Sequence, residues 1–308
     1  MSEEKNDNNA AGTSACASCG SAEIDDIKLN KCIDCDLVRY CSDECKKEHE
    51  PTHKEACKKR AAELRDELLF KQPENSHLGD CPICCLPMPL DTTNKNLMCC
   101  SKVICKGCNY ANQVREAVGK LQRKCVFCRA AIPSSKEEVD KYRMKRIEAN
   151  DPVAMHREGS SEGKKGNYIK AFEYFTKAVE LGDVEAHYQL SIMYNYEHGV
   201  EKDMGAVIHH TEEAAIGGHP YARHNLGIIE WNNGDSERAV KHWIIAASQG
   251  HDLSIKALLN AFKRGMIIKD ELAAALRTHQ AAVDATRSPQ RERAAEYHQT
   301  ERNFVFSL

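Results

Sequence analysis

The sequence predicts a mainly α-helical protein in which two small cross-braced zinc fingers precede an α-solenoid of helical hairpin repeats. Three observations support this fold class. All sixteen cysteines lie at or before Cys128, and most of them stand in close pairs. Alanine, leucine and glycine recur in the back half at intervals of 32 or 36 residues, a spacing typical of stacked helical units. At 308 residues the chain has room for two or three domains.

Charge and hydropathy limit the partners that the sequence favours. The net charge is −3, and the basic run from Lys54 to Arg60 is interrupted by glutamate, so nucleic acid is not an expected partner. No stretch approaches the ~20 apolar residues of a membrane span, and the first residues lack the apolar core of a signal peptide. We therefore expect an intracellular protein, cytoplasmic or nuclear, with reduced thiols and protein partners.

Residues 15–57 carry the first finger, after a polar segment, 1–14, that is predicted to be a disordered tail. Seven cysteines and one histidine form four close pairs, enough for two tetrahedral Zn(II) sites. The pairs are Cys16 and Cys19, Cys32 and Cys35, Cys41 and Cys45, and His53 and Cys57. Disulfides and plain buried thiols are the alternatives, and His49 is an alternative ligand to His53. Because the chain lacks secretory features, its CxxC pairs favour metal ligation over these alternatives.

The ligand spacing and the run Val38–Cys41 resemble the MYND zinc finger. This resemblance implies that one zinc binds Cys16, Cys19, Cys41 and Cys45, and the other binds Cys32, Cys35, His53 and Cys57. Members of the family commonly bind proline-rich peptides, with glutamine just after the sixth ligand and tryptophan three residues before the histidine ligand. Lys46 and Glu50 occupy those positions here, so the aromatic platform for proline is missing.

Residues 58–78 are predicted to form a helix and a linker. Pro51 stands where a first helical residue is favoured, apolar residues at helical spacing continue to about Phe70, and Pro73 ends the helix.

Residues 79–131 contain a second cluster that resembles a RING-type finger. The resemblance implies one zinc on Cys81, Cys84, Cys105 and Cys108, and a second on Cys99, Cys100, Cys125 and Cys128. Lys102 stands where the family has a histidine ligand, and the adjacent Cys99 would replace it. A second site with three protein ligands, or without zinc, stays an alternative, and Cys85 is interpreted as a bystander. We expect three to four structural zinc ions per chain.

The RING-like finger also implies a partner, a ubiquitin-conjugating enzyme. Ile83 occupies the family's hydrophobic contact point, and Arg129 occupies the place of the arginine that bridges ubiquitin and the conjugating enzyme. A helix over Ala111–Lys124 would border the same groove. The alternative interpretation is that Ile83 packs its own loop and Arg129 is simply solvated.

The back half follows a linker, 132–149, that has a helical stretch. Residues 150–284 are predicted to form four units, 150–182, 183–218, 219–250 and 251–284. Glycine ends the first three units, and the pattern resembles Sel1-like repeats, which are related to TPR repeats. The first unit is degenerate because Glu158 replaces a recurring leucine. Residues 285–308 form a C-terminal tail that is expected to fray or to dock Phe304–Phe306 on the last repeat.

No phosphate-binding loop or nucleophile elbow is present in the sequence, and no catalytic residue is assigned. Two hypotheses follow. In the first, the protein is a non-enzymatic adaptor whose fingers and repeats each bind a protein. In the second, it is a RING-type E3 ubiquitin ligase that orients a charged conjugating enzyme and recruits substrate through the repeats.

Overall fold

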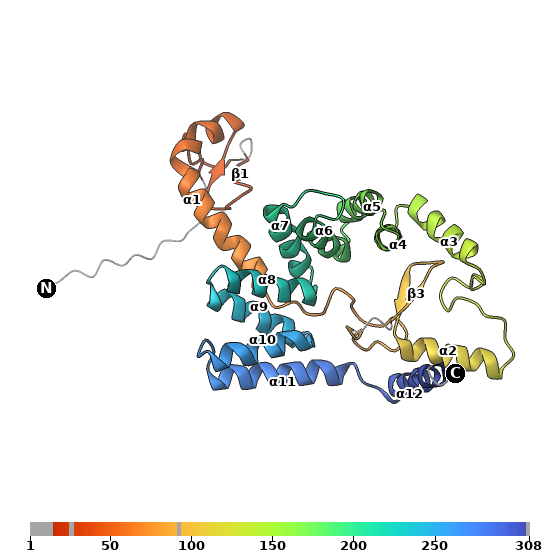
Figure 1. The fold of residues 1–308 in the computed structure, drawn as a ribbon. Helices are drawn as coiled ribbons and strands as arrows, with labels where there is room; N and C mark the ends of the chain where they lie inside the picture. Colours follow the sequence, from red (N-terminus) through yellow and green to blue (C-terminus); the bar gives the residue numbers. More distant parts are fainter. Residues whose placement is uncertain (1–14, 25–27, 91–93, 306–308) are drawn as a thin grey trace. The chain divides into compact units, whose positions relative to one another are not determined.

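The computed structural model describes residues 15–24, 28–90 and 94–305, with side chains as far as residue 299, so the tail expected at 1–14 lies outside it. The chain divides into two units, Met1–Lys71 and Gln72–Leu308. The first holds a small cysteine-rich finger, and the second holds another cysteine-rich cluster and stacked helical hairpins (Figure 1). The predicted fold class is therefore confirmed. Among the described residues, no helix is both long and apolar enough to cross a membrane.

The first unit is organised around its sulfur atoms. Strand β1, Asn30–Lys31, pairs in antiparallel fashion with β2, Arg39–Tyr40, and helix α1, Asp43–Leu69, follows. The buried residues that form its small core are Cys16, Leu29, Cys32, Cys35 and Tyr40. A core with so few carbon side chains buries too little apolar surface to order the segment alone, so ligation of the sulfurs is expected to supply most of the folding free energy.

Helix α1 begins at Asp43, and the expected start at Pro51 is wrong. The hydroxyl of Ser42 accepts a hydrogen bond from the backbone N–H of Cys45 at 3.3 Å, and Asp43 follows in the first turn, where a carboxylate favours the helix dipole. Pro51 lies inside the helix and removes one backbone donor from it. The cap at Ser42 is thus a stronger start signal than the proline. The observed end at Leu69 is close to the expected one.

The second unit opens with an irregular segment and a hairpin. Strand β3, Lys95–Leu97, pairs in antiparallel fashion with β4, Lys102–Ile104. Helix α2, Lys106–Val118, replaces the expected helix over Ala111–Lys124, which was placed too far along the chain. The reason is local: the sulfur of Cys105 caps the helix by accepting from the N–H of Cys108 at 3.4 Å, and Gly119 ends it. Helix α3, Lys136–Glu148, occupies most of the predicted linker.

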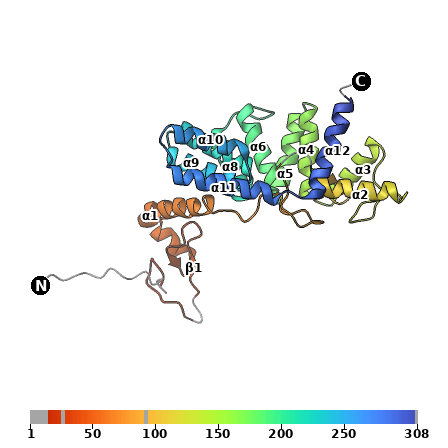
Figure 2. The same ribbon diagram turned by 90° about the horizontal axis from the view of Figure 1, so that it is seen from below.

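Four helical hairpins then stack in sequence order (Figure 1), and Figure 2 shows the same stack from below. Each consecutive pair packs together. Gly182, Gly218 and Gly250 adopt φ of 82°, 81° and 86°, so glycine does end these helices as predicted. The helices are α4 Pro152–Lys164, α5 Tyr168–Glu180, α6 Val184–Tyr196, α7 Met204–Ile216, α8 Pro220–Asn232, α9 Ser236–Ser248, α10 Asp252–Lys263 and α11 Lys269–Ala285.

The recurring residues form the repeat core. Small side chains at Ala186, Ala222 and Ser254 are fully buried, which allows close approach of neighbouring helices. The leucines that follow each of them by four positions are also buried. In the first hairpin Glu158 takes the leucine position, and the carboxylate is buried against the guanidinium of Arg143 from α3. Pairing with that cation explains how a charge is tolerated there.

The C-terminal segment forms helix α12, Pro289–Val305, which packs against α2 of the second finger (Figure 1). Ala294 is fully buried, and the rings of Tyr297 and Tyr110 lie 5.0 Å apart between centroids. The backbone is therefore helical here and does not fray within the described range. The expected docking of Phe304–Phe306 falls outside the described side chains.

Candidate metal centres and binding surfaces

The structure gathers the eight ligand candidates of the first finger into two groups of four, with the donor atoms of each group within 4.8 Å of one another. The sulfur of Cys41 lies 3.5 Å from that of Cys19 and 3.6 Å from that of Cys45. A zinc tetrahedron with bonds of about 2.3 Å places its sulfurs about 3.8 Å apart. The groups are Cys16, Cys19, Cys41 and Cys45, and Cys32, Cys35, His53 and Cys57.

The thiols of the first group have different pKa values, because a sulfur that is ionised disfavours ionisation of the sulfurs next to it. A hydrogen bond from the backbone N–H of Cys19 lowers the pKa of Cys16 to about 6. The sulfur of Cys19, close by, raises the pKa of Cys41 to about 12. Four adjacent thiolates repel one another, so all four ionise together only when a cation lies between them. A divalent metal bound by thiolates satisfies that condition.

The second group includes His53, and His49 lies outside it. The Nε2 atom of His53 is 3.2 Å from the sulfur of Cys35, and His53 is buried. His49 instead pairs through Nδ1 with the hydroxyl of Tyr40 at 3.1 Å and stacks on His53 with centroids 5.6 Å apart. His49 therefore packs against the ring of His53 but lies outside the donor group.

The second finger shows the same crossed arrangement. Its first and third cysteine pairs form one group and its second and fourth pairs form another, with both Cys99 and Cys100 in the latter. Sulfur separations are 3.7 Å for Cys100 and Cys125 and 3.3 Å for Cys99 and Cys128. Cys85 is exposed and outside both groups. The groups are Cys81, Cys84, Cys105 and Cys108, and Cys99, Cys100, Cys125 and Cys128.

The alternative of disulfides has no counterpart in the structure, where all sixteen cysteines are free thiols. The four-donor groups of the second finger also favour full coordination over a three-ligand site. Each group is filled by protein donors, as in structural zinc sites, and none resembles a catalytic site with an open position.

Sequence reasoning missed a recurring turn after the CxxC pairs. In four of them, the residue after the second cysteine adopts a left-handed φ, and its N–H donates to the carbonyl of the first cysteine. Cys85 (φ 54°) and Arg129 (φ 60°) occupy this position in the second finger, as Gly20 and Asp36 do in the first. The backbone conformation of these residues thus forms the turns that orient the two cysteine sulfurs of each pair toward the same point.

The two residues assigned to a conjugating enzyme are accessible. The side chain of Ile83 is 44 % exposed, and Arg129 is exposed as well. Val118, at the end of α2, is 81 % exposed. Both side chains are therefore accessible to a partner, and their role in binding one stays a prediction.

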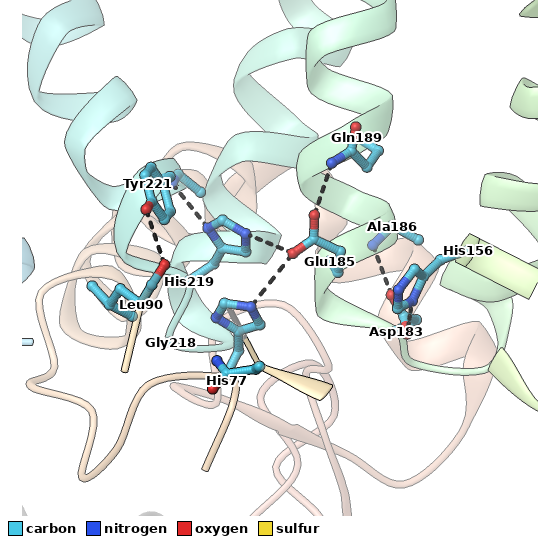
Figure 3. A network of polar contacts seen from close by, with 12 residues as sticks. His77, Leu90, His156, Asp183, Glu185, Ala186, Gln189, Gly218, His219 and Tyr221 are labelled. Atoms are coloured by element: carbon cyan, nitrogen blue, oxygen red, sulfur yellow. Dashed lines mark hydrogen bonds and ion pairs between the residues drawn. The ribbon is translucent and has the colours of Figure 1, made fainter. Parts of the chain in front are cut away.

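A further polar group, not found from the sequence, ties the segment before the second finger to the repeats (Figure 3). The carboxylate of Glu185 lies 3.2 Å from Nε2 of His219 and 3.5 Å from Nε2 of His77. The two histidine rings stack with centroids 4.2 Å apart, and the N–H of His77 donates to the carbonyl of Gly218 at 3.0 Å. Burial opposes the charge of Glu185, but hydrogen bonds from His219 and His77 hold its pKa below the usual value.

These three side chains lie close enough to suggest a metal site, but the hydrogen bonds favour another interpretation. The Nδ1 atom of His219 accepts the N–H of Ala222 at 3.2 Å and so caps helix α8. The ring proton then sits on Nε2, which donates to Glu185 and has no lone pair for a metal. The three side chains therefore form a hydrogen-bonded contact that joins the segment before the second finger to the second and third repeats.

Two concave surfaces accompany the metal centres. A cleft of about 660 Å³ in the first finger is lined by Lys46, Glu50 and ligand residues of the second group. A groove of about 510 Å³ on the repeats is lined by α6, α7 and α8 and includes Tyr196, Met204 and Ile228, which are 64 %, 45 % and 42 % exposed. Exposed apolar side chains in a groove are typical of protein-binding surfaces.

Comparison with known families agrees with two of the three resemblances. Residues 16–57 match the model of the MYND finger, and residues 154–183, 184–219 and 220–251 match that of the Sel1 repeat. The second finger lies outside the matched ranges, so its RING-like character stays a prediction, as does the fourth repeat unit. A search of curated proteins gave no match.

Two solved structures are similar to the chain. A Sel1 repeat protein from Oxalobacter formigenes is 22 % identical, with 57 % of this chain and 73 % of that chain covered and a TM-score of 0.43. A protective antigen with an SLR fold, from uropathogenic Escherichia coli strains, is also 22 % identical. That match covers 54 % of this chain and 37 % of the other, with a TM-score of 0.39.

Proposed function

We propose that this protein is a zinc-dependent, intracellular adaptor that joins protein partners through its fingers and its repeats. The observation that carries the proposal is the presence of two kinds of protein-interaction module in one chain, a MYND finger and Sel1 repeats. A zinc ion bound by any of the four-donor groups would have no open coordination position for a substrate, so its expected role is structural. Four zinc ions, one for each four-donor group, would order the fingers.

The groove on the repeats is the proposed surface for one partner. Its exposed side chains, Tyr196, Met204 and Ile228, provide apolar contact area, and the neighbouring asparagines provide amide groups that can bind a peptide backbone. The cleft of the first finger is the proposed surface for a second partner. Because charged Lys46 and Glu50 line that cleft, its ligand does not depend on stacking of proline on tryptophan.

Affinity purification with matched variants tests the adaptor function. Ile228→Glu places a charge in the groove, Lys46→Glu reverses one in the finger cleft, and Ile169→Glu is the control on an exposed apolar residue outside the groove. We expect each test variant to lose a different partner and the control to lose none. Sequential purification through both partners should recover one complex. Loss of every partner by a single variant, or of none by any variant, contradicts the proposal.

A ubiquitin-ligase activity is the second candidate, favoured by one observation, the exposure of Ile83 and Arg129 on a finger with crossed cysteine groups. The protein would be incubated with E1, a panel of conjugating enzymes, ubiquitin and ATP. Chains that disappear with Ile83→Ala or Arg129→Ala, and persist with Ile33→Ala on the first finger, support the ligase. Absence of chains across the panel supports the adaptor alone.

A further inference from the structure

A cleft of about 870 Å³ lies beside helix α4, at the junction of the second finger with the first repeats. One wall is apolar and comes from Leu78, Met98 and Val103 of the finger and the segment before it. The other walls come from α3, α4 and the start of α6. A space of this volume accommodates several residues of an extended peptide or a small ligand.

The guanidinium of Arg157 is the notable group in this cleft. Its Nε atom is buried without a hydrogen-bond partner, and no ion pair joins Arg157 to any residue within the described ranges. Burial is the largest influence on Arg157 and lowers its pKa, against weaker attraction from Glu185, Asp183 and Asp151. A half-buried charge without a partner costs free energy, which an anion in the cleft would offset.

The acidic residues that line the cleft are already engaged (Figure 3). Asp183 accepts hydrogen bonds from His156 at 2.8 Å and from the N–H of Ala186 at 2.7 Å. Glu185 is bound by His219 and by the amide of Gln189 at 2.7 Å. Neither carboxylate forms an ion pair with Arg157. The guanidinium can therefore form one with an anionic group of a ligand.

The same face of α4 supplies further groups. Arg157, Ser161 and Lys164 follow one another at i, i+4 and i+7, which places them along one side of the helix and in the cleft lining. Lys164 is exposed and forms no ion pair with a described residue, whereas the adjacent Lys165 pairs with Glu162. Two cations without partners and a hydroxyl thus face one cleft.

We propose that this cleft binds an anionic side chain, a carboxylate or a phosphate, of a partner protein segment, and that Arg157 pairs with it. The inference rests on the proposed adaptor function and specifies the chemistry of a partner. Arginine presents parallel N–H donors that match the oxygens of either group. The apolar wall at Leu78, Met98 and Val103 would bind the flanking residues, which favours a peptide over a free ion.

A peptide library tests the proposal on the zinc-loaded full chain. One position is fixed as glutamate, phosphoserine, glutamine or lysine, and the flanking positions are randomised. We expect enrichment of glutamate or of phosphoserine, and whichever is enriched identifies the source of the anion. Arg157→Met should weaken binding of the selected peptide about tenfold or more, and Arg157→Lys less, because lysine keeps the charge without the planar fork. Lys170→Met, on exposed α5 surface outside the cleft, should leave affinity unchanged.

Thermal stability separates a binding role from a structural one. Because the Nε atom of Arg157 is buried without a partner, Arg157→Met should leave the Tm of the free chain unchanged or raise it. A lower Tm would assign Arg157 to folding and overturn the proposal. No preference for anionic residues, or a preference that Arg157→Met leaves intact, would also overturn it, as would Arg157-dependent binding of an RNA oligonucleotide in place of peptides. If the cleft fails while Ile228→Glu still loses a partner, the adaptor function stands without this inference.

Discussion

The guanidinium of Arg291, in the last helix, donates a hydrogen bond to the sulfur of Cys84 at 3.3 Å, although the two residues are 207 positions apart. The same side chain donates to the carbonyls of Leu86 at 3.1 Å and Pro87 at 2.7 Å. Arg291 thereby holds the loop that carries the first ligand pair of the second finger. A charge-assisted hydrogen bond to a thiolate stabilises the ionised form that binds metal.

Removal of this contact should weaken zinc retention in the second finger. We expect the Arg291→Met variant to lose one zinc ion to a chelator about 10–100-fold faster than the unmodified chain does. The release is followed with a colorimetric zinc indicator. Arg293→Met, two positions away on the exposed side of α12, is the control. Equal release from both variants would show that Arg291 has no role at the metal.

The four donor groups predict a metal count that elemental mass spectrometry can check. We expect four zinc ions per chain purified under reducing conditions, since each group has four donors at zinc-compatible separations. Cys99→Ser should reduce the count by about one. Cys85→Ser should leave it unchanged, because Cys85 is outside the groups. A count of two or fewer in the unmodified chain would refute the assignment of the second finger.

Two glycines inside helices should respond in opposite directions to the same substitution. A Cβ at Gly227 would lie 2.3 Å from Nε1 of Trp243, which is buried, whereas a Cβ at Gly163 would meet Ala171 at an ordinary 3.8 Å. Gly227→Ala should therefore destabilise the protein by about 1–3 kcal/mol. Gly163→Ala should stabilise it by up to about 1 kcal/mol through helix propensity. Chemical denaturation of both variants measures the difference, and similar shifts would contradict the packing seen here.

The buried pair of Glu158 and Arg143 predicts strong coupling. Arg143→Met alone should cost about 3 kcal/mol because it leaves a buried carboxylate uncompensated. Glu158→Leu alone should cost less, since Arg143 keeps Asp140 as a partner. The double variant restores the leucine pattern of the other repeats and should be close to the original stability. A double-mutant cycle in urea gives the coupling energy, and additive single effects would argue against the pair.

Acidification should destabilise the repeats through buried histidines. Burial lowers the pKa of His251 to about 4, below the value of about 6.5 in an unfolded chain. The neutral form is favoured in the fold, so its contribution is complete above about pH 6.5 and is lost as the pH falls toward 4. We expect His251→Gln to reduce the loss of stability over this range by about 1–3 kcal/mol. His209→Gln, at an exposed site, is the control, and comparison with it removes the contribution of zinc release.

Local patterns in the sequence were sufficient to predict the helical repeats and to predict which cysteines lie together in each donor group. Gly182, Gly218 and Gly250 need a left-handed φ, which glycine adopts without strain, so the sequence predicted these helix ends. The start of α2 was missed because the sulfur of Cys105 caps this helix. From the sequence, Cys105 is interpreted only as a zinc ligand, and cysteine is not among the usual N-cap residues. The pairing of His77 with Glu185 and of Arg291 with Cys84 joins residues more than a hundred positions apart, and no local periodicity encodes such pairs.

Helix α12 has a consequence for how this architecture can change over time. Repeat arrays ordinarily gain or lose units by duplication and deletion, because each unit touches only its neighbours. Here the chain returns from the final hairpin to the finger that precedes the first one. An array with one more or one fewer hairpin would carry Arg291 away from Cys84, so a change in the number of repeats would break this contact as well as altering the length of the array.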